Sequence, residues 1–241
     1  MKILVIGGMH GNEPLGLEVV KLFKANPVKD IYVILANEVA VEKSRRFVKK
    51  DMNRAFPGNA KSRDYEEKRA SELLKLCKKY ELVLDFHNTH CPNNDCTFVG
   101  NYAKDFLFDV SSWLGLKRVI IADYDCINKF APNCISIEVS LSSKLMKPPF
   151  WFKRIIELAN ARSIPKQRGL KKYRFVYRVT LEDRDRLQLD KKKLKAFKAL
   201  SKELANVMGL QSPAYPIFIG DSYTPYYYGG LLNRIQARDG L

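Results

Sequence analysis

Short apolar runs alternate with amphipathic segments through the first two thirds of the chain. The apolar runs, which predict strands, cover residues 2–7, 30–36, 81–86, 117–122 and 135–139. The segments with apolar residues at helical spacing cover residues 14–23, 64–80, 106–114 and 149–161. Because strands alternate with helices, we predict an α/β fold with a mixed, largely parallel central sheet flanked by helices.

The pattern changes after Pro165. Residues 173–181 alternate basic and apolar side chains, which predicts a half-exposed strand, and residues 194–207 have the pattern of a basic amphipathic helix. A short strand over 215–219 and a Tyr/Gly/Pro loop over 222–230 follow. We therefore predict two domains, a main domain over residues 1–165 and a small, basic, α+β or β-rich C-terminal domain over residues 166–241.

Charge separates the same two parts of the chain. The 241 residues carry a formal net charge of +16, and their hydrophobic content of 46% is ample for a core. Residues 1–140 hold 21 Lys+Arg against 18 Asp+Glu, whereas residues 141–241 hold 21 against 8. The excess is concentrated at residues 166–178 and 191–202. A positive field of this size favours an anionic ligand, a nucleic acid or an acidic surface.

The apolar runs and the cysteines indicate the cellular compartment of the protein. No apolar run approaches the roughly 20 residues of a membrane-spanning helix, and the run over 3–6 is too short for a signal peptide. The five cysteines are an odd number with no export signal, which favours free thiols in a reducing compartment. We therefore expect a cytoplasmic protein without a membrane partner; a homo-oligomer remains open.

Two of the three histidines follow predicted strands. His10 lies just past the first strand with Glu13 three residues later, and His87 closes the third. Ligands gather at the carboxyl ends of strands in α/β sheets, and two histidines with one carboxylate can hold zinc with an open fourth position. Each residue alone would more simply be structural, but their combination favours zinc. We assign no ligand role to His90, and Cys91-x4-Cys96 lacks the second pair of a structural zinc site.

Further candidate residues carry acid–base and anion-binding chemistry. Glu138 lies in an apolar strand, where it is either a general base and acid or half of an ion pair, and both interpretations stay open. Arg54 with Asn53 could hold a substrate carboxylate in a bidentate fork. Arg46 could polarise a scissile carbonyl, whereas its basic neighbours are interpreted as a solvated face.

Taken in order, four segments resemble the aspartoacylase and succinylglutamate desuccinylase family, a branch of the zinc carboxypeptidase-like fold. They are GGMHGNE, RRF with DMNR, DFHNT and IEV, and YPIFIGDSY near the C-terminus is a weaker fifth match. The resemblance is strong over residues 1–140 and loose over 141–241. It implies a catalytic domain whose cleft is capped by the C-terminal domain.

The resemblance also implies roles for individual residues. One zinc ion per chain would be held by His10, Glu13 and His87, with Glu138 as general base and Arg46 as carbonyl polariser. Asn53 and Arg54 would hold the α-carboxylate of an N-acyl amino acid. Tyr124 matches a substrate-facing tyrosine, and the C-terminal one is among Tyr223, Tyr226, Tyr227 and Tyr228, with Tyr223 taken as the candidate. The arginine that aspartoacylases use for the substrate's side-chain carboxylate would fall near Asn128, beside Lys129.

Three functions follow from these observations. The first is a zinc amidohydrolase (an N-acyl amino acid deacylase) acting on a small anionic substrate. The second is a zinc carboxypeptidase that uses the same residues on short peptides. The third is a non-catalytic, basic nucleic-acid-binding or interaction protein, motivated by the charge of residues 141–241, although the chain has none of the common RNA- or DNA-binding signatures.

Overall fold

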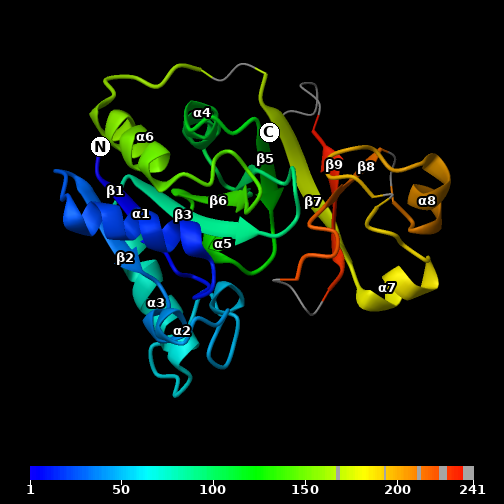
Figure 1. Cartoon of the computed structure of the whole chain (residues 1–241), viewed down its shortest axis with the longest axis horizontal. Coiled ribbons are helices and arrows are strands. Elements are labelled where there is room, and N and C mark those ends of the chain that lie inside the picture. The colour runs from blue at the N-terminus through cyan, green and yellow to red at the C-terminus, as the bar shows by residue number, and fades with distance from the viewer. Residues whose placement is uncertain (167–168, 193, 211–212, 223–226, 236–241) are drawn as a thin grey trace.

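One mixed sheet runs from the N-terminal to the C-terminal part of the chain (Figure 1). The computed structural model describes residues 1–166, 169–192, 194–210, 213–222 and 227–235. Within them the strand order is β2-β1-β3-β6-β4-β5-β7-β9-β8. The strands are β1 (Ile3–Gly7), β2 (Ile31–Leu35), β3 (Leu82–Thr89), β4 (Cys96–Gly100), β5 (Arg118–Ala122), β6 (Cys134–Ser140), β7 (Lys171–Val179), β8 (Ala214–Ile217) and β9 (Gly229–Arg234).

Parallel pairing dominates the sheet. Strands β2, β1, β3 and β6 are parallel neighbours, as are β4, β5 and β7. Antiparallel pairs join β6 to β4 and link β7, β9 and β8. The predicted mixed, largely parallel sheet flanked by helices is therefore confirmed.

Helices cover both faces of the sheet (Figure 1). On one face α1 (Pro14–Ala25), α4 (Asp105–Trp113) and α6 (Pro148–Asn160) pack on one set of alternate strand residues. On the other face α3 (Tyr65–Cys77) and α5 (Ile127–Phe130) pack on the alternate set, which includes Leu4, Ile6 and Val83. Since strands buried on both faces read as continuous apolar runs, this layering explains the sequence pattern.

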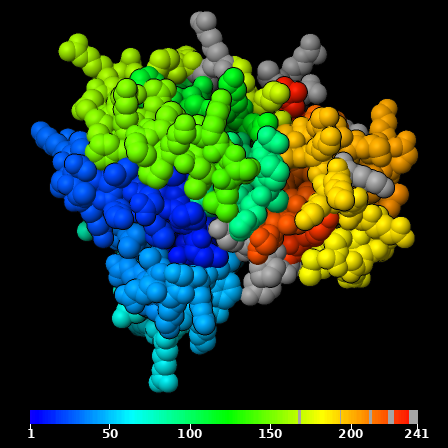
Figure 2. All heavy atoms as spheres, viewed as in Figure 1, coloured from blue at the N-terminus to red at the C-terminus, as the bar shows by residue number. Residues whose placement is uncertain are grey.

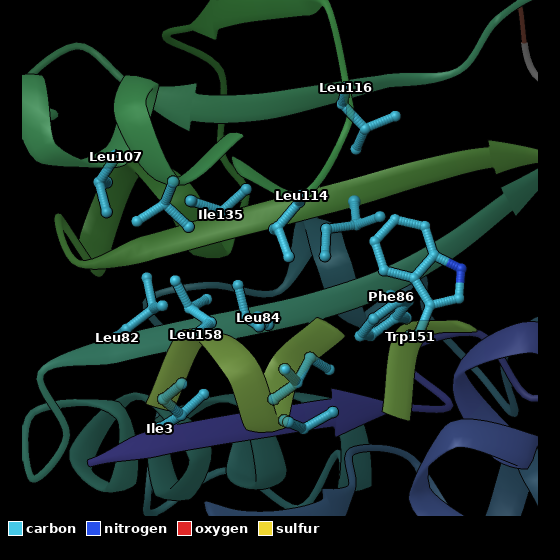
Figure 3. Close-up of a cluster of buried hydrophobic side chains, with 14 of the residues drawn as sticks. Ile3, Leu82, Leu84, Phe86, Leu107, Leu114, Leu116, Ile135, Trp151 and Leu158 are labelled. Carbon is cyan, nitrogen blue, oxygen red and sulfur yellow. The ribbon is translucent and has the colours of Figure 1, made fainter. Parts of the chain in front are cut away.

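The larger core cluster lies under α6 (Figure 3). Trp151 has no exposed surface, meets Phe86 of β3 edge to face with ring centroids 5.2 Å apart, and donates its indole N–H to Leu145 O at 2.8 Å. Such pairing is favourable for aromatic rings, and the hydrogen bond satisfies the buried N–H. This cluster holds β3 rigidly, and β3 carries His87.

Several short elements differ from the sequence predictions. Strands β4 and β9, and helices α2 (Glu38–Glu42), α5, α7 (Leu181–Arg186) and the 3-10 turn η1 (Met52–Arg54), were not predicted. The predicted helix over 194–207 is wrong in its first half, because α8 is limited to Lys202–Val207. Residues before it bond to a strand edge instead, with Phe197 N donating to Pro216 O at 2.9 Å and Leu200 N donating to Ala214 O at 2.8 Å.

The C-terminal strands continue the main sheet. Strand β7 pairs in parallel with β5, and the alternation of exposed and buried residues along it matches the predicted half-exposed strand. In the space-filling view this part of the chain gathers on one side of the molecule (Figure 2). The division into two domains at residue 165 stays a prediction. Among the described residues, no helix has the length and apolar character needed to cross a bilayer.

Candidate active site

A glycine-rich turn places His10 and Glu13 beyond the end of β1. Gly8 has a φ of 68°, and a Cβ on Gly11 would lie 2.1 Å from the backbone carbon of Ala40, so glycine is required at both positions. Glu13 then precedes the first residue of α1. Asn88, at the end of β3, accepts the Leu15 N–H at 2.9 Å and so fixes the start of this helix against the strand that carries His87.

His10, Glu13 and His87 form a buried cluster. One ligand-type atom from each lies within 4.8 Å of the others. His10 Nδ1 is 2.7 Å from Glu13 Oε1, and His87 Nδ1 is 3.1 Å from Glu13 Oε2. The two Nδ1 atoms are 3.3 Å apart, so both rings present the same nitrogen to the carboxylate.

The opposite nitrogen of each ring faces another carboxylate. His10 Nε2 is 3.1 Å from Asp51 Oδ1, and His87 Nε2 is 2.7 Å from Asp85 Oδ2. An Nε2–H donated to a carboxylate leaves Nδ1 as a lone-pair acceptor, as in the carboxylate–histidine–metal arrangement. Two such lone pairs and one carboxylate then converge on one point and need a cation between them. This donor set fits zinc.

Electrostatics in the cluster agree with a cation site. Burial alone would raise the pKa of Glu13, but the two histidines outweigh it and hold that pKa well below its usual range. Burial likewise works against a charged His87, yet Asp85 and Glu13 raise its pKa well above the ordinary value. The pocket therefore favours positive charge at the point where the three side chains meet.

Glu138 lies beside this cluster on the adjacent strand. It is the register partner of His87 in the β3–β6 pair and lines the same cavity. Burial raises the pKa of Glu138 well above its usual value; His87 opposes that shift, and the neighbouring charges of Glu13 and Asp221 add to it. Among the described residues no ion pair to Glu138 is formed, so the structure shows no partner for the ion-pair interpretation there.

Arg46 and Asp51 close one side of the cluster. Arg46 Nη1 donates to Glu13 Oε1 at 3.2 Å, and its Nη2 donates to Asp51 Oδ2 at 3.1 Å. Burial lowers the pKa of Arg46, but the two carboxylates more than compensate and raise it. Arg46 therefore stays protonated and lies next to the candidate metal ligands.

A buried carboxylate holds the segment that carries Arg46. Glu66 of α3 has no exposed surface, and its Oε1 accepts the Val48 N–H at 2.7 Å and the Lys49 N–H at 3.3 Å. The same oxygen accepts from Asn37 Nδ2 at 3.3 Å, and Asn37 caps α2. Glu66 therefore ties the Arg46 segment to two helices.

Replacing Glu66 with alanine is expected to lower the free energy of unfolding by about 2 kcal/mol, because it removes the acceptor of two backbone N–H groups and of the buried Asn37 amide. Glu72→Ala, on the same helix but exposed, is the matched control and should change it by less than about 0.5 kcal/mol. Denaturant unfolding monitored by circular dichroism measures both. Equal effects of the two substitutions would show that Glu66 does not anchor the segment.

Asn53, Arg54 and Tyr124 line the cavity opposite the cluster. Asn53 Oδ1 accepts the Ile127 N–H at 3.2 Å, which directs its amide nitrogen away from that helix. Arg54 stacks over the Tyr124 ring at 4.8 Å and donates to the Tyr227 hydroxyl at 3.3 Å. Among the C-terminal tyrosines, Tyr227 lines the cavity, Tyr228 instead bonds Leu189 O, and Tyr223 and Tyr226 lie outside the described residues.

The two residues at the expected arginine position already have partners within the chain. Asn128 donates its amide hydrogens to Phe98 O at 3.1 Å and Cys134 O at 3.2 Å, so they are already used. Lys129 Nζ pairs with Asp125 at 2.9 Å. Besides Arg46 and Arg54, the cavity is lined by Arg178 of β7, whose guanidinium lies 4.9 Å from the Tyr227 ring centroid.

Arg178, Asp51 and Asp85 were not predicted as site residues. Asp85 stands two residues before His87 in DFHNT, where an acidic residue near a ligand histidine was a usable signal, whereas Asp51 in DMNR is distant in sequence from His10. Arg178 has no local signal, because only the pairing of β7 with β5 brings it to the cavity. All predicted site residues within the described part of the chain line one cavity: His10, Glu13, Arg46, Asn53, Arg54, His87, Tyr124 and Glu138.

The fold is of the α/β class, and three arginines, three carboxylates and the two histidines of the metal-compatible cluster line its cavity. The family model for the succinylglutamate desuccinylase/aspartoacylase catalytic domain matches residues 1–121. The chain belongs to that family, which confirms the resemblance drawn from the four motifs.

Individual relatives agree with this assignment. The N-acyl-aromatic-L-amino acid amidohydrolase (carboxylate-forming) of Rattus norvegicus is 32% identical over 136 residues, 49% of this chain and 43% of the rat protein. A probable aspartoacylase of Trichodesmium erythraeum is 29% identical over 147 residues, 55% of this chain and 50% of that protein. The matches thus span about half the length of these relatives.

Solved structures share the fold. The succinylglutamate desuccinylase of Chromobacterium violaceum superposes with a TM-score of 0.75 at 17% identity, over 98% of this chain and 85% of that one. Murine aminoacylase 3 superposes with a TM-score of 0.69 at 20% identity, over 98% of this chain and 95% of that one. The similarity therefore extends beyond the matched N-terminal residues and includes the C-terminal strands.

Proposed function

We propose that this protein is a zinc-dependent hydrolase that cleaves the amide bond of a small, anionic N-acyl amino acid. The observation that carries the proposal is the convergence of His10 and His87 on Glu13, with the far nitrogen of each ring held by its own carboxylate. Membership of the desuccinylase/aspartoacylase family and the amidohydrolases among its relatives support it.

The chain's own residues supply most of the chemistry. Zinc held by His10, Glu13 and His87 would lower the pKa of bound water and polarise a carbonyl. Glu138 faces the cavity without an ion-pair partner among the described residues, so it can take a proton from the attacking water and pass it to the leaving amine. Arg46 presents a fixed positive charge for the oxyanion that develops at the carbonyl.

The substrate carboxylate belongs on the other side of the cavity. Arg54 makes no ion pair among the described residues, and two aromatic rings orient its guanidinium. The Asn53 amide nitrogen lies next to it in the same lining. Together they offer a guanidinium fork and an amide donor to an α-carboxylate.

The proposal is tested by metal analysis joined to a hydrolysis screen. The full chain, purified with zinc, is assayed on N-acetyl and N-succinyl amino acids and on short peptides. Release of free amino acid from the acyl compounds supports the deacylase. Hydrolysis confined to peptides would establish the carboxypeptidase alternative, and neither activity with bound zinc would contradict both.

Arg178→Gln is expected to raise KM about tenfold for substrates with a second carboxylate and to leave kcat nearly unchanged. The reason is the loss of one charge-assisted hydrogen bond at the cavity mouth. Arg174→Gln on the same strand is the matched control, since Arg174 bonds Asn101 outside the cavity. Steady-state kinetics on paired acidic and neutral N-acyl amino acids measure the effect, and an equal change for both would argue against this role.

A further inference from the structure

A second, larger cavity lies outside the candidate active site. Its volume is about 890 Å³, and Phe218 is the residue that the linings of the two cavities share. We call it the basic groove, and six cationic side chains line it: Arg118, Lys171, Lys191, Lys192, Lys195 and Lys198. Five of these six cations come from the basic C-terminal region.

The irregular course of residues 194–201 creates this groove. Phe197 has a φ of 57°, and its N–H and that of Leu200 bond to β8 rather than to a helical carbonyl. A turn in which Lys198 N donates to Lys195 O at 3.1 Å leaves both lysines lining the groove, at the end of the sheet away from α1 (Figure 1).

The opposite wall and the floor are fixed by specific contacts. Arg118 donates to Asn93 O at 2.7 Å, and its guanidinium lies 4.3 Å from the Phe197 ring centroid. Below it, Asn94 Oδ1 accepts the Phe218 N–H at 2.9 Å. The groove is thus lined by one arginine with defined contacts and by five lysines.

The charge in the groove is not neutralised within the described chain. None of the described residues that line it is an aspartate or glutamate, and none of the six cations forms an ion pair with a described carboxylate. Like charges gathered within a Debye length of about 8 Å repel one another. An anion with several charges relieves that repulsion.

The aromatic side chains that line the groove indicate which class of anion it binds. Tyr173 is only 2% exposed, and the Phe197 ring is covered by Arg118, so neither offers an open face on which a nucleobase could stack. Stacking platforms contribute much of the binding of single-stranded nucleic acids. The groove therefore offers charge and hydrogen-bond donors, which suit phosphoryl oxygens.

We propose that the basic groove binds an oligophosphate chain, supplied by a nucleoside triphosphate or by inorganic polyphosphate. Lysines 191, 192, 195 and 198 would neutralise successive phosphates, and Arg118 would hold one in a fixed orientation. This site is independent of the proposed hydrolase activity, since none of the six cations lines the active-site cavity.

The test compares a groove variant with a matched control. Isothermal titration of tripolyphosphate and ATP, without added divalent metal and in 150 mM NaCl, is made on the wild type, Lys195→Gln/Lys198→Gln and Lys21→Gln/Lys24→Gln. The control pair is exposed on α1 and removes the same charge. Both variants keep the His–Glu–His cluster, so binding of phosphate at a metal there contributes equally.

We expect the groove variant to bind tripolyphosphate about tenfold more weakly and the control to stay within twofold of the wild type. Equal affinity for ATP and tripolyphosphate would identify the bare phosphate chain as the ligand, and tighter ATP binding would identify the nucleotide. Equal weakening in both variants, or no binding, would overturn the proposal. So would groove-dependent binding of a single-stranded RNA oligonucleotide without binding of either phosphate probe.

Discussion

Glu138→Ala is expected to lower kcat by about a thousandfold while zinc still binds with wild-type stoichiometry. Glu138 lies next to His87 across the β3–β6 pair but is not one of the three converging ligands. A positioned general base contributes roughly 10²- to 10⁴-fold to the rate, and its removal leaves the ligands in place. Rapid-quench or coupled assays of amino acid release, with metal analysis of the same samples, measure the two quantities.

Glu138→Gln is the sharper version of this experiment. Glutamine keeps the size of the side chain but cannot exchange the proton, so the rate should fall as much as with alanine. Because burial raises the pKa of Glu138, the ionised carboxylate costs free energy in the folded state above the ordinary pKa. At neutral pH the metal-free Gln variant should therefore be at least as stable as the wild type. A variant that is both active and less stable would identify Glu138 as a structural residue.

Local motifs made part of this site predictable. The GGMHGNEP turn and the DFHNT strand end each carry their ligand-type residues within a few positions of an apolar strand. The rule that parallel strand ends meet at one edge then brings His10 and His87 together without any knowledge of the fold. For the same reason the long buried strands β1 and β3 were predicted from their apolar runs.

Residues brought in by distant pairing were not predictable. Arg178 reaches the cavity only because β7 pairs with β5. In that pair Lys171 lies opposite Arg118, which is 53 positions earlier in the chain. The error over residues 194–201 has a similar cause, since the apolar spacing of Leu194, Phe197 and Leu200 suits a helix. The N–H groups of Phe197 and Leu200 instead donate to carbonyls of β8. This pairing covers an edge of β8 that would otherwise be open.

The basic residues that line the candidate active site differ from those that line the basic groove. In the candidate active site, Arg46 is paired with carboxylates, whereas Arg54 and Arg178 contact aromatic rings. Most of the lysines of residues 191–202 lie outside that cavity. The proposed hydrolase therefore uses three arginines, and the basic groove gathers five of the 21 basic residues of residues 141–241.

Removal of the metal is expected to abolish turnover and to lower the thermal midpoint of unfolding. In the metal-free protein two histidine nitrogens and a carboxylate face one another within 3.3 Å, and only protons can relieve that arrangement. A ligand present at a thousand times its Kd stabilises the folded state by about 4 kcal/mol. Calorimetry with and without a chelator, followed by zinc addition, measures the shift and its reversal.

The three histidines supply their own controls. His10→Ala and His87→Ala should each lose stoichiometric zinc and reduce kcat/KM by at least about a thousandfold, because three-ligand zinc sites do not tolerate loss of a ligand. His90→Ala should keep zinc, since His90 is exposed and outside the cluster. Asp85→Asn should weaken zinc binding about 10- to 100-fold, because it removes the negative charge of the acceptor that orients His87. If His90→Ala lost zinc and His10→Ala retained it, the metal would have to lie near the Cys91–Cys96 segment, and the proposed site would be overturned.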